Sequence, residues 1–406
     1  MASTAGGMAR RQLRQFIPRT TVLATPTPSC SYRTAAAAAT RPFSSSAQAP
    51  SSWPAAASPT SDIKGKARAD GPIAIPAPPR AKTIADIHAL KQSGVPIVCL
   101  TAYDYPTALS IRAAPIDLCL VGDSLANVAL GHSSTQPLSL HAMIHHCQAV
   151  RRAIDAPLFS APIPGIDLPP PPLVIADLPF VATLGSLDTV VAAVGKLIQE
   201  SGIDGVKIEG EHEAIPLIRH LTQRGIPVMG HVGLQPQRIA STSGYRVQGK
   251  TASDAKHILD AALALQAAGC FSMVLECIPT RLGEHISHAL DIPTIGIGAG
   301  NKTDGQILVM NDVLADLTSP GHVLAALAPA EAQTEKQHAV MPAASPLAPA
   351  PPKFVRNFCA PGSIGALRIA AVQAYARAVR DRSFPNDHEA YKIKSTEWAA
   401  FLQLTS

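Results

Sequence analysis

Two charged residues interrupt a strand-like apolar run in the segment GVKIEGE, residues 205–211. Side chains two positions apart on a β-strand point to the same face, so Lys207 and Glu209 share one side of it. An ammonium and a carboxylate in such a place can form an internal ion pair, or they can belong to a polar site with other charged groups. The neighbouring strands decide between these two interpretations.

Other apolar runs also end in ionisable or hydrogen-bonding residues. These endings are Tyr103 and Asp104, Asp123 and Ser124, Asp177, Lys207 and Glu209, His231, and Glu276. Taken singly, Asp123 can cap a helix, Asp177 can form an Asx turn, and His231 can be a hydrogen-bonded core residue. Taken together, three or four buried carboxylates near one ammonium carry excess negative charge, which a divalent cation would neutralise. Asp and Glu oxygens suit magnesium.

The elements that must position these residues alternate along the chain. Eight strand-like runs are VPIVCLTAYD, IDLCLVGDS, LVIADLPF, GVKIEG, IPVMGHVG, FSMVLECIP, IPTIGIGAG and QILVMNDVL. Helical patterns separate most of them, most clearly at 186–202, 211–225 and 253–269, with Ser186 as an expected N-cap. This alternation predicts an α/β protein, a (β/α)8 barrel whose chemistry lies at the C-terminal ends of the strands. The sequence has no Gly-rich dinucleotide fingerprint after the first strand, which disfavours a Rossmann fold.

Proline-rich segments divide the chain. They cover 42–80, 161–172 and 326–352, and proline at that density cannot continue a helix or a central strand. We therefore expect a leader and disordered linker over 1–80 and a catalytic barrel over 81–400 with two inserts. The first insert precedes the strand of Asp177 and is expected at the non-catalytic end. The second follows the eighth strand and is expected nearer the active face.

The positive charge is concentrated at the start of the chain. The formal net charge is +5, and residues 1–61 contain arginines but no Asp or Glu. A basic, Ser-rich, acid-free segment is typical of a mitochondrial transit peptide, although a disordered basic tail has the same composition. The remainder is close to neutral, which gives no indication of a nucleic-acid partner, and no apolar run is long enough to span a bilayer. Seven cysteines without paired spacing indicate core thiols in a reducing compartment.

The motifs resemble, in their order, those of the ketopantoate hydroxymethyltransferase family. The matching segments are TAYDYPTA, LVGDSLANVALGHSSTQPLSL, AVRR, ADLPF, GVKIEG, VMGHVGLQPQ, GYRVQGK, MVLECIP, IGIGAGNKTDGQILVMND and PKFVRNF. The resemblance runs from about residue 82 to about residue 385, apart from the two inserts. It implies a TIM barrel of the phosphoenolpyruvate/pyruvate type, a requirement for Mg²⁺, and a homo-oligomer, which is a decamer in bacterial members.

The resemblance also implies a reaction and roles for the strand-end residues. The reaction is transfer of a hydroxymethyl group from 5,10-methylenetetrahydrofolate to 3-methyl-2-oxobutanoate, which gives 2-dehydropantoate in pantothenate (vitamin B5) biosynthesis. Magnesium would stabilise the enolate that forms. The implied roles are metal binding for Asp123, Asp177 and Glu209, substrate binding for Asp123, Ser124, Asp177, Lys207 and His231, and proton abstraction for Glu276. Burial of Glu276 in an apolar strand should raise its basicity.

Two other interpretations remain for comparison. One is another magnesium-dependent barrel acting on a 2-oxo acid, such as a lyase of the isocitrate lyase or phosphonopyruvate type. Such lyases need a catalytic cysteine loop or a phosphonate site, and the sequence contains neither a KKCGH-like segment nor an arginine cluster for it. The other is an inactive barrel kept as a scaffold. That interpretation predicts loss of the polar strand ends, which are present.

The leader generates the first testable prediction. A fusion of residues 1–60 to a fluorescent protein is expected to enter the mitochondrial matrix and to lose an N-terminal segment, because the leader is basic and free of acidic residues. Microscopy and the size of the processed product measure this. A fusion that stays cytosolic and unprocessed would contradict the prediction.

Overall fold

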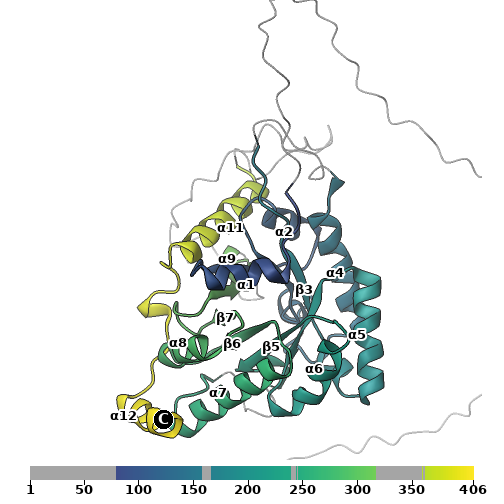
Figure 1. Ribbon diagram of the computed structural model, residues 1–406. Helices are drawn as coiled ribbons and strands as arrows, with labels where there is room; N and C mark the ends of the chain where they lie inside the picture. The colour runs from purple at the N-terminus through teal and green to yellow at the C-terminus, as the bar shows by residue number, and fades with distance from the viewer. Residues whose placement is uncertain (1–78, 158–165, 239–243, 245, 317–358, 360–361) are drawn as a thin grey trace, which may run out of the picture. The chain divides into compact units, whose positions relative to one another are not determined.

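The computed structural model describes residues 79–157, 166–238, 244, 246–316, 359 and 362–406 (Figure 1). The expected leader and linker up to residue 78, and the insert expected at 326–352, lie outside these residues. All eight expected strands are present. They are β1 (Ile97–Thr101), β2 (Leu118–Val121), β3 (Leu173–Asp177), β4 (Gly205–Glu209), β5 (Val228–Gly233), β6 (Ser272–Glu276), β7 (Thr294–Ile297) and β8 (Gly305–Leu308).

The strands form one closed parallel barrel. Neighbours pair in chain order from β1 to β8, and β8 pairs back with β1, which confirms the predicted (β/α)8 fold. Both faces of the sheet are buried, so alternate residues of a strand enter two different cores. In β1, Cys99 belongs to the core inside the barrel, whereas Val98 and Leu100 belong to the core between the sheet and the helices.

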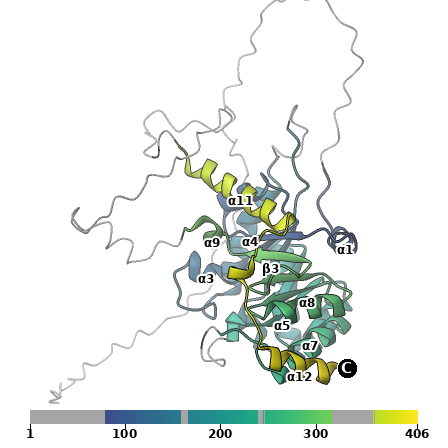
Figure 2. The ribbon, with the colours of Figure 1, turned by 90° about the vertical axis from the view of Figure 1, so that its left-hand side faces the viewer.

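Most helices follow a strand and lie outside the barrel (Figures 1 and 2), whereas the first helix precedes β1 and places Ile87 in the core inside the barrel. They are α1 (Ile84–Gln92), α2 (Tyr105–Ile111), α3 (Leu125–Val128), α4 (Leu140–Ile154), α5 (Leu187–Ser201), α6 (Ile215–Thr222), α7 (Ala252–Ala267), α8 (Thr280–Ala289), α9 (Met310–Leu314), α11 (Ile364–Arg380) and α12 (Ser395–Thr405). Short 3₁₀ turns are η2 (Phe180–Thr183), η3 (His212–Ala214), η4 (Pro236–Arg238) and η6 (Asp387–Glu389). In the described part of the chain, no helix is both long enough and apolar enough to cross a membrane.

The helix boundaries follow local capping chemistry. The Ser186 hydroxyl accepts a hydrogen bond from the Thr189 N–H at the start of α5, and Gly202 ends that helix in the left-handed region with φ of 68°, as expected from the sequence. The expected start of α7 at Ser253 is one residue late. The helix begins at Ala252 because Thr251 is the N-cap and accepts from the Asp254 N–H. The segment 211–225 splits into η3 and α6.

The N-terminal end of the barrel is held by a buried carboxylate. Asp117, which precedes β2, is fully buried and accepts a hydrogen bond from the Val98 N–H at 2.7 Å. It forms ion pairs with Lys82, which precedes α1, and with Arg380 of α11, whose nitrogen lies 2.7 Å from Oδ2. This one carboxylate therefore ties β1, the start of the described chain and α11 to β2. The described part of the first insert, 166–172, is attached to the same end, where the Lys82 N–H donates to the Pro171 carbonyl.

Replacing Asp117 by Asn is expected to lower the free energy of unfolding by about 2–3 kcal/mol, since two cations lose their buried partner. Denaturant titration of the purified protein measures the change. The matched control is Asp260→Asn, which breaks the more exposed i,i+4 pair with Lys256 and should cost less than about 1 kcal/mol. Equal losses in the two variants would show that Asp117 has no special role.

Candidate active site

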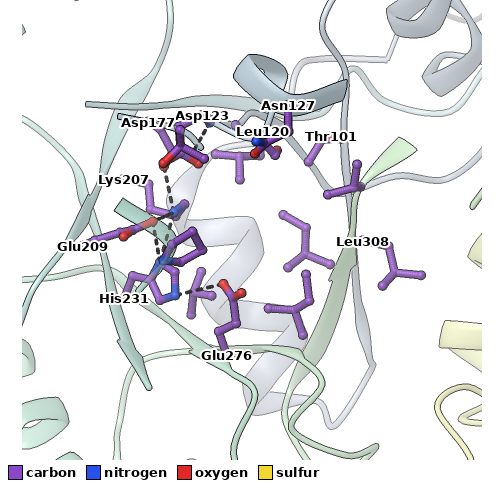
Figure 3. A pocket seen from close by; sticks show the side chains of 18 of the residues that line it. Thr101, Leu120, Asp123, Asn127, Asp177, Lys207, Glu209, His231, Glu276 and Leu308 are labelled. Carbon is purple, nitrogen blue, oxygen red and sulfur yellow. Dashed lines mark hydrogen bonds and ion pairs between the residues drawn. The ribbon is translucent and has the colours of Figure 1, made fainter. Parts of the chain in front are cut away.

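The C-terminal ends of the strands surround one cavity of about 340 Å³. Figure 3 shows Lys207, Glu209 and His231 on one side of the cavity and Leu308 on the other. The lining residues are Thr101, Leu120, Gly122, Asp123, Ser124, Asn127, Val128, Thr135, Asp177, Lys207, Glu209, Pro236, His231, Val274, Glu276, Ile297, Ile307, Leu308, Val309 and Asp312. Every residue given a role in the sequence analysis is in this set. The barrel therefore brings together residues that are up to 153 positions apart, Asp123 and Glu276.

Lys207 is the cation at the centre of the polar side. Its Nζ lies 2.8 Å from Asp177 Oδ1, 3.1 Å from His231 Nδ1 and 3.8 Å from Glu209 Oε1, and its side chain is only 5% exposed. The ammonium is thus closest to Asp177 on the adjacent strand, and Asp177 and Lys207 are direct partners in the β3–β4 register. The simple alternative of an isolated Lys207–Glu209 ion pair does not describe this arrangement.

Asp177 and Asp123 meet at the ends of β2 and β3. The Asp123 N–H donates to Asp177 Oδ2 at 2.8 Å, so the Asp177 carboxylate joins two strand ends and does not form an Asx turn. Asp123 does not cap α3, because Ser124 is the N-cap residue of that helix. Gly122 leaves room for the neighbouring hydroxyl, since a Cβ there would lie only 2.9 Å from Ser124 Oγ.

Three buried carboxylate oxygens at this end accept no hydrogen bond from the described residues: Asp123 Oδ2, Asp177 Oδ1 and Glu209 Oε1. Lys207 forms ion pairs with the last two, and Glu209 Oε2 accepts a hydrogen bond from the Gln237 N–H at 3.0 Å. Buried carboxylate oxygens without donors are costly unless a cation binds them. In the described residues, no three His, Cys, Asp or Glu side chains are close enough together to hold a metal ion alone. The donor set therefore fits a Mg²⁺ ion that takes its other ligands from substrate and water.

His231 connects Lys207 to Glu276. The Lys207 ammonium can only donate, so His231 Nδ1 must accept, and the imidazole proton is on Nε2. Nε2 lies 3.1 Å from Glu276 Oε2 (Figure 3), but the two atoms are not aligned for a hydrogen bond. Burial, followed by the nearby Lys207 charge, lowers the pKa of His231 well below its usual value, which keeps the ring neutral. His231 is thus a close neutral neighbour of Glu276 and cannot easily take up a proton itself.

Burial dominates the ionisation of the carboxylates. It raises the pKa of Glu276 to about 8 and that of Asp177 to about 7, even though Lys207 acts in the opposite direction on both. It also raises the pKa of Glu209 well above its usual value, and the nearby Asp123 charge adds to this. For Lys207, burial alone would lower the pKa, but the charges of Asp177 and Glu209 outweigh it and raise the pKa. The site contains one ammonium and several carboxylates, so it has too little positive charge to balance them, as the sequence analysis expected.

Several site residues were not singled out from the sequence. Ser124 Oγ lies 2.8 Å from the hydroxyl of Tyr103, a buried strand-end residue that the sequence analysis noted without giving it a role. Asp104, grouped with it, lies outside the cavity lining and is the N-cap of α2, where Oδ1 accepts from the Thr107 N–H. Thr135 is buried at the cavity wall, and its hydroxyl has no partner. Nothing in its local sequence distinguishes Thr135 from an ordinary loop residue.

Comparison with known proteins identifies the family of this site. Residues 81–325 match the family described as ketopantoate hydroxymethyltransferase. The chain belongs to the ketopantoate hydroxymethyltransferase family. It is an enzyme of the hydroxymethyltransferase type, and the match covers all strands of the barrel, including every strand end described above.

Curated relatives agree with the family assignment. The 3-methyl-2-oxobutanoate hydroxymethyltransferase 1, mitochondrial, of Oryza sativa subsp. japonica is 38% identical over 79% of this chain and 77% of its own length. The 3-methyl-2-oxobutanoate hydroxymethyltransferase of Geobacillus kaustophilus is 36% identical over 79% of this chain and 97% of its own length. Among solved structures, 2,3-dimethylmalate lyase of the PEP mutase/isocitrate lyase superfamily gives a TM-score of 0.40 at 15% identity and covers 61% of this chain and 86% of its own.

The raised pKa of Glu276 generates a prediction about pH and stability. The folded protein binds this proton up to about pH 8, whereas an ordinary Glu releases it near 4.5. Between these values the folded state holds more protons than the unfolded state, so the free energy of unfolding falls as pH rises. Glu276→Gln removes this loss. In EDTA, the stability of the variant relative to wild type should therefore increase from pH 5 to pH 8, by at most about 1.4 kcal/mol per unit.

Denaturant titrations at several pH values measure this difference. The control is Glu213→Gln, because the pKa of Glu213 is lowered and its side chain is 49% exposed. That variant should show no relative gain between pH 5 and pH 8. A constant difference between Glu276→Gln and wild type over this interval would contradict the burial argument.

Proposed function

We propose that this enzyme transfers a hydroxymethyl group from 5,10-methylenetetrahydrofolate to 3-methyl-2-oxobutanoate, giving 2-dehydropantoate and tetrahydrofolate in pantothenate biosynthesis. The observation that carries the proposal is Glu276, a carboxylate only 15% exposed, which lies 3.1 Å from His231 at the edge of a cavity that contains Lys207 and surplus carboxylates. A base of raised pKa beside a site for an anionic 2-oxo acid is what removal of a proton next to a ketone requires. Names of relatives support the same substrate.

The polar side of the cavity orients the substrate. Lys207 Nζ offers positive charge to the substrate carboxylate, and Ser124 Oγ, held by Tyr103, offers a hydroxyl donor at the same end. Asp123, Asp177 and Glu209 would hold Mg²⁺, because each has a buried oxygen that accepts no hydrogen bond. A bound Mg²⁺ would offset the negative charge that develops on the oxygens of the substrate. Asp123 and Asp177 would also contact the substrate, at the same end of the cavity as Lys207 and Ser124.

Glu276 then acts on carbon 3 of the substrate. Its carboxylate takes the proton from C3, and the C–H electron pair moves into the adjacent ketone to form an enolate. The enolate carbon forms the new bond to the one-carbon unit that the folate donates. Both bonds from the donated carbon to folate nitrogens N5 and N10 break, and water supplies the hydroxyl group of the product. The two nitrogens of the departing tetrahydrofolate take up one proton from this water and the one that Glu276 removed from C3. His231 stays neutral beside the base, with Nε2 3.1 Å from Glu276 Oε2.

The setting of the enzyme is part of the proposal. Residues 1–61 have the composition of a mitochondrial leader, and the rice relative is named mitochondrial, so we place the enzyme in the mitochondrial matrix. Its partners are the two small-molecule substrates. Assembly into a homo-oligomer, a decamer by resemblance, stays a prediction that light scattering of the purified protein can test.

The two kinds of carboxylate generate a paired prediction. Glu276→Gln keeps shape but cannot accept a proton, so it should reduce solvent-deuterium exchange at C3 of 3-methyl-2-oxobutanoate by about 10³-fold or more. Binding of Mg²⁺ and of the 2-oxo acid should remain close to wild type, as measured by calorimetry. Glu209→Gln should instead weaken Mg²⁺ binding, and partial exchange should return at high Mg²⁺ concentration.

The exchange experiment is followed by proton NMR in D₂O without folate, so that it isolates the proton-transfer step. Exchange at the wild-type rate in Glu276→Gln would require another base, and His231 would be the next candidate. Loss of exchange in Glu209→Gln that no Mg²⁺ concentration restores would contradict its assignment to the metal.

A further inference from the structure

The side of the cavity next to the base is made of aliphatic residues. Val274, Ile297, Ile307 and Leu308 line it, and each comes from β6, β7 or β8. Val274 and Ile307 are also members of the core inside the barrel, with Ile297 packed against it. The cavity is therefore divided into a charged part and a part that can accept only an apolar group.

Strand register fixes which of these residues lie beside Glu276. In the β6–β7 pairing, Glu276 is the direct partner of Ile297. Val274 is two residues before Glu276 on β6 and points to the same face. In the β7–β8 pairing, Gly296 is the partner of Gln306, so one residue further along both strands Ile297 lies next to Ile307. Glu276, Ile297 and Ile307 thus form a row across three neighbouring strands.

The chemistry of the substrate places its branched end in this row. In 3-methyl-2-oxobutanoate, the carbon that loses its proton carries both methyl groups. Once Glu276 reaches that carbon, the methyl groups are within one bond of it and must contact the neighbours of Glu276. The carboxylate end of the substrate is directed away, toward Lys207, which lies on β4 beyond His231.

We propose that Ile297 and Ile307 form the subsite for the two methyl groups and set the size of the branched chain that the enzyme accepts. This inference rests on the proposed function and adds a specificity-determining role to residues that the reaction itself does not require. A 2-oxo acid with one more methylene at C3 meets these two side chains, whereas one with a methyl group fewer leaves space beside them unfilled. Both the larger and the smaller acid therefore fit the cavity less well, because its walls are strands of the barrel and cannot easily move to adapt.

The test compares C3 deuterium exchange for three acids: 2-oxobutanoate, 3-methyl-2-oxobutanoate and racemic 3-methyl-2-oxopentanoate. The full-length wild-type protein with Mg²⁺ should prefer 3-methyl-2-oxobutanoate. Ile297→Ala and Ile307→Ala should each shift the rate ratio toward 3-methyl-2-oxopentanoate by about tenfold. Ile297→Val should shift it in the same direction by a smaller factor, which guards against loss of folding in the Ala variants.

The matched control is Val128→Ala. Val128 also lines the cavity, but it lies on α3, after β2, and β2 is four strands away from β6 in the barrel. Whatever its effect on the rate, this variant should leave the preference among the three acids unchanged. An unchanged preference in the Ile297 and Ile307 variants, with exchange still present, would overturn the subsite and leave the proposed function intact. Absence of exchange in the wild type would overturn the proposed function and the subsite with it.

Discussion

The site depends on the charge balance around one buried ammonium. Lys207 is 5% exposed and has carboxylates on two adjacent strand ends and a histidine on the next, so it is the shared partner of the polar residues around it. A single positive charge cannot neutralise Asp123, Asp177, Glu209 and Glu276 together, and burial makes every uncompensated charge costly. Burial is the main cause of the raised pKa values of Asp177 and Glu276, and the nearby Asp123 charge adds to it. The same imbalance makes the site a good host for a divalent cation and an acidic substrate.

Lys207 also determines what the other groups can do. By donating to His231 Nδ1, it sets the tautomer whose Nε2 faces Glu276, and so it influences the base through an intermediate ring. At its other side it contacts Asp177, which accepts the Asp123 N–H. Contacts between neighbouring strands therefore connect the carboxylates expected to bind the metal with the carboxylate expected to take the proton. These residues lie at the ends of strands, and the strands of a closed barrel have fixed spacing, so their relative positions do not depend on flexible loops.

The opposite side of the cavity has a different physical role. Aliphatic side chains from β6, β7 and β8 remove water from the neighbourhood of Glu276 and so raise its basicity. The same side chains are the natural contacts for an apolar branch on the reacting carbon. The same aliphatic residues thus raise the basicity of Glu276 and restrict the size of the substrate's branched chain. These two roles explain why the cavity is divided into a charged half and an apolar half.

The sequence by itself determined the barrel and the chemical character of its strand ends. Apolar runs such as VPIVCL form strands because they are buried on both faces, and Lys207 and Glu209 were already assigned to one face by the period of two. Local sequence also determined the ends of α5, whereas α7 starts at Ala252, one residue earlier than expected, because Thr251 is its N-cap. Tertiary structure decided the partners: that Lys207 is closest to Asp177, that His231 faces Glu276, that Asp104 only caps a helix, and that Ile297 and Ile307 lie beside the base. Those contacts depend on the register between strands distant in sequence, and no single strand encodes its neighbour's register.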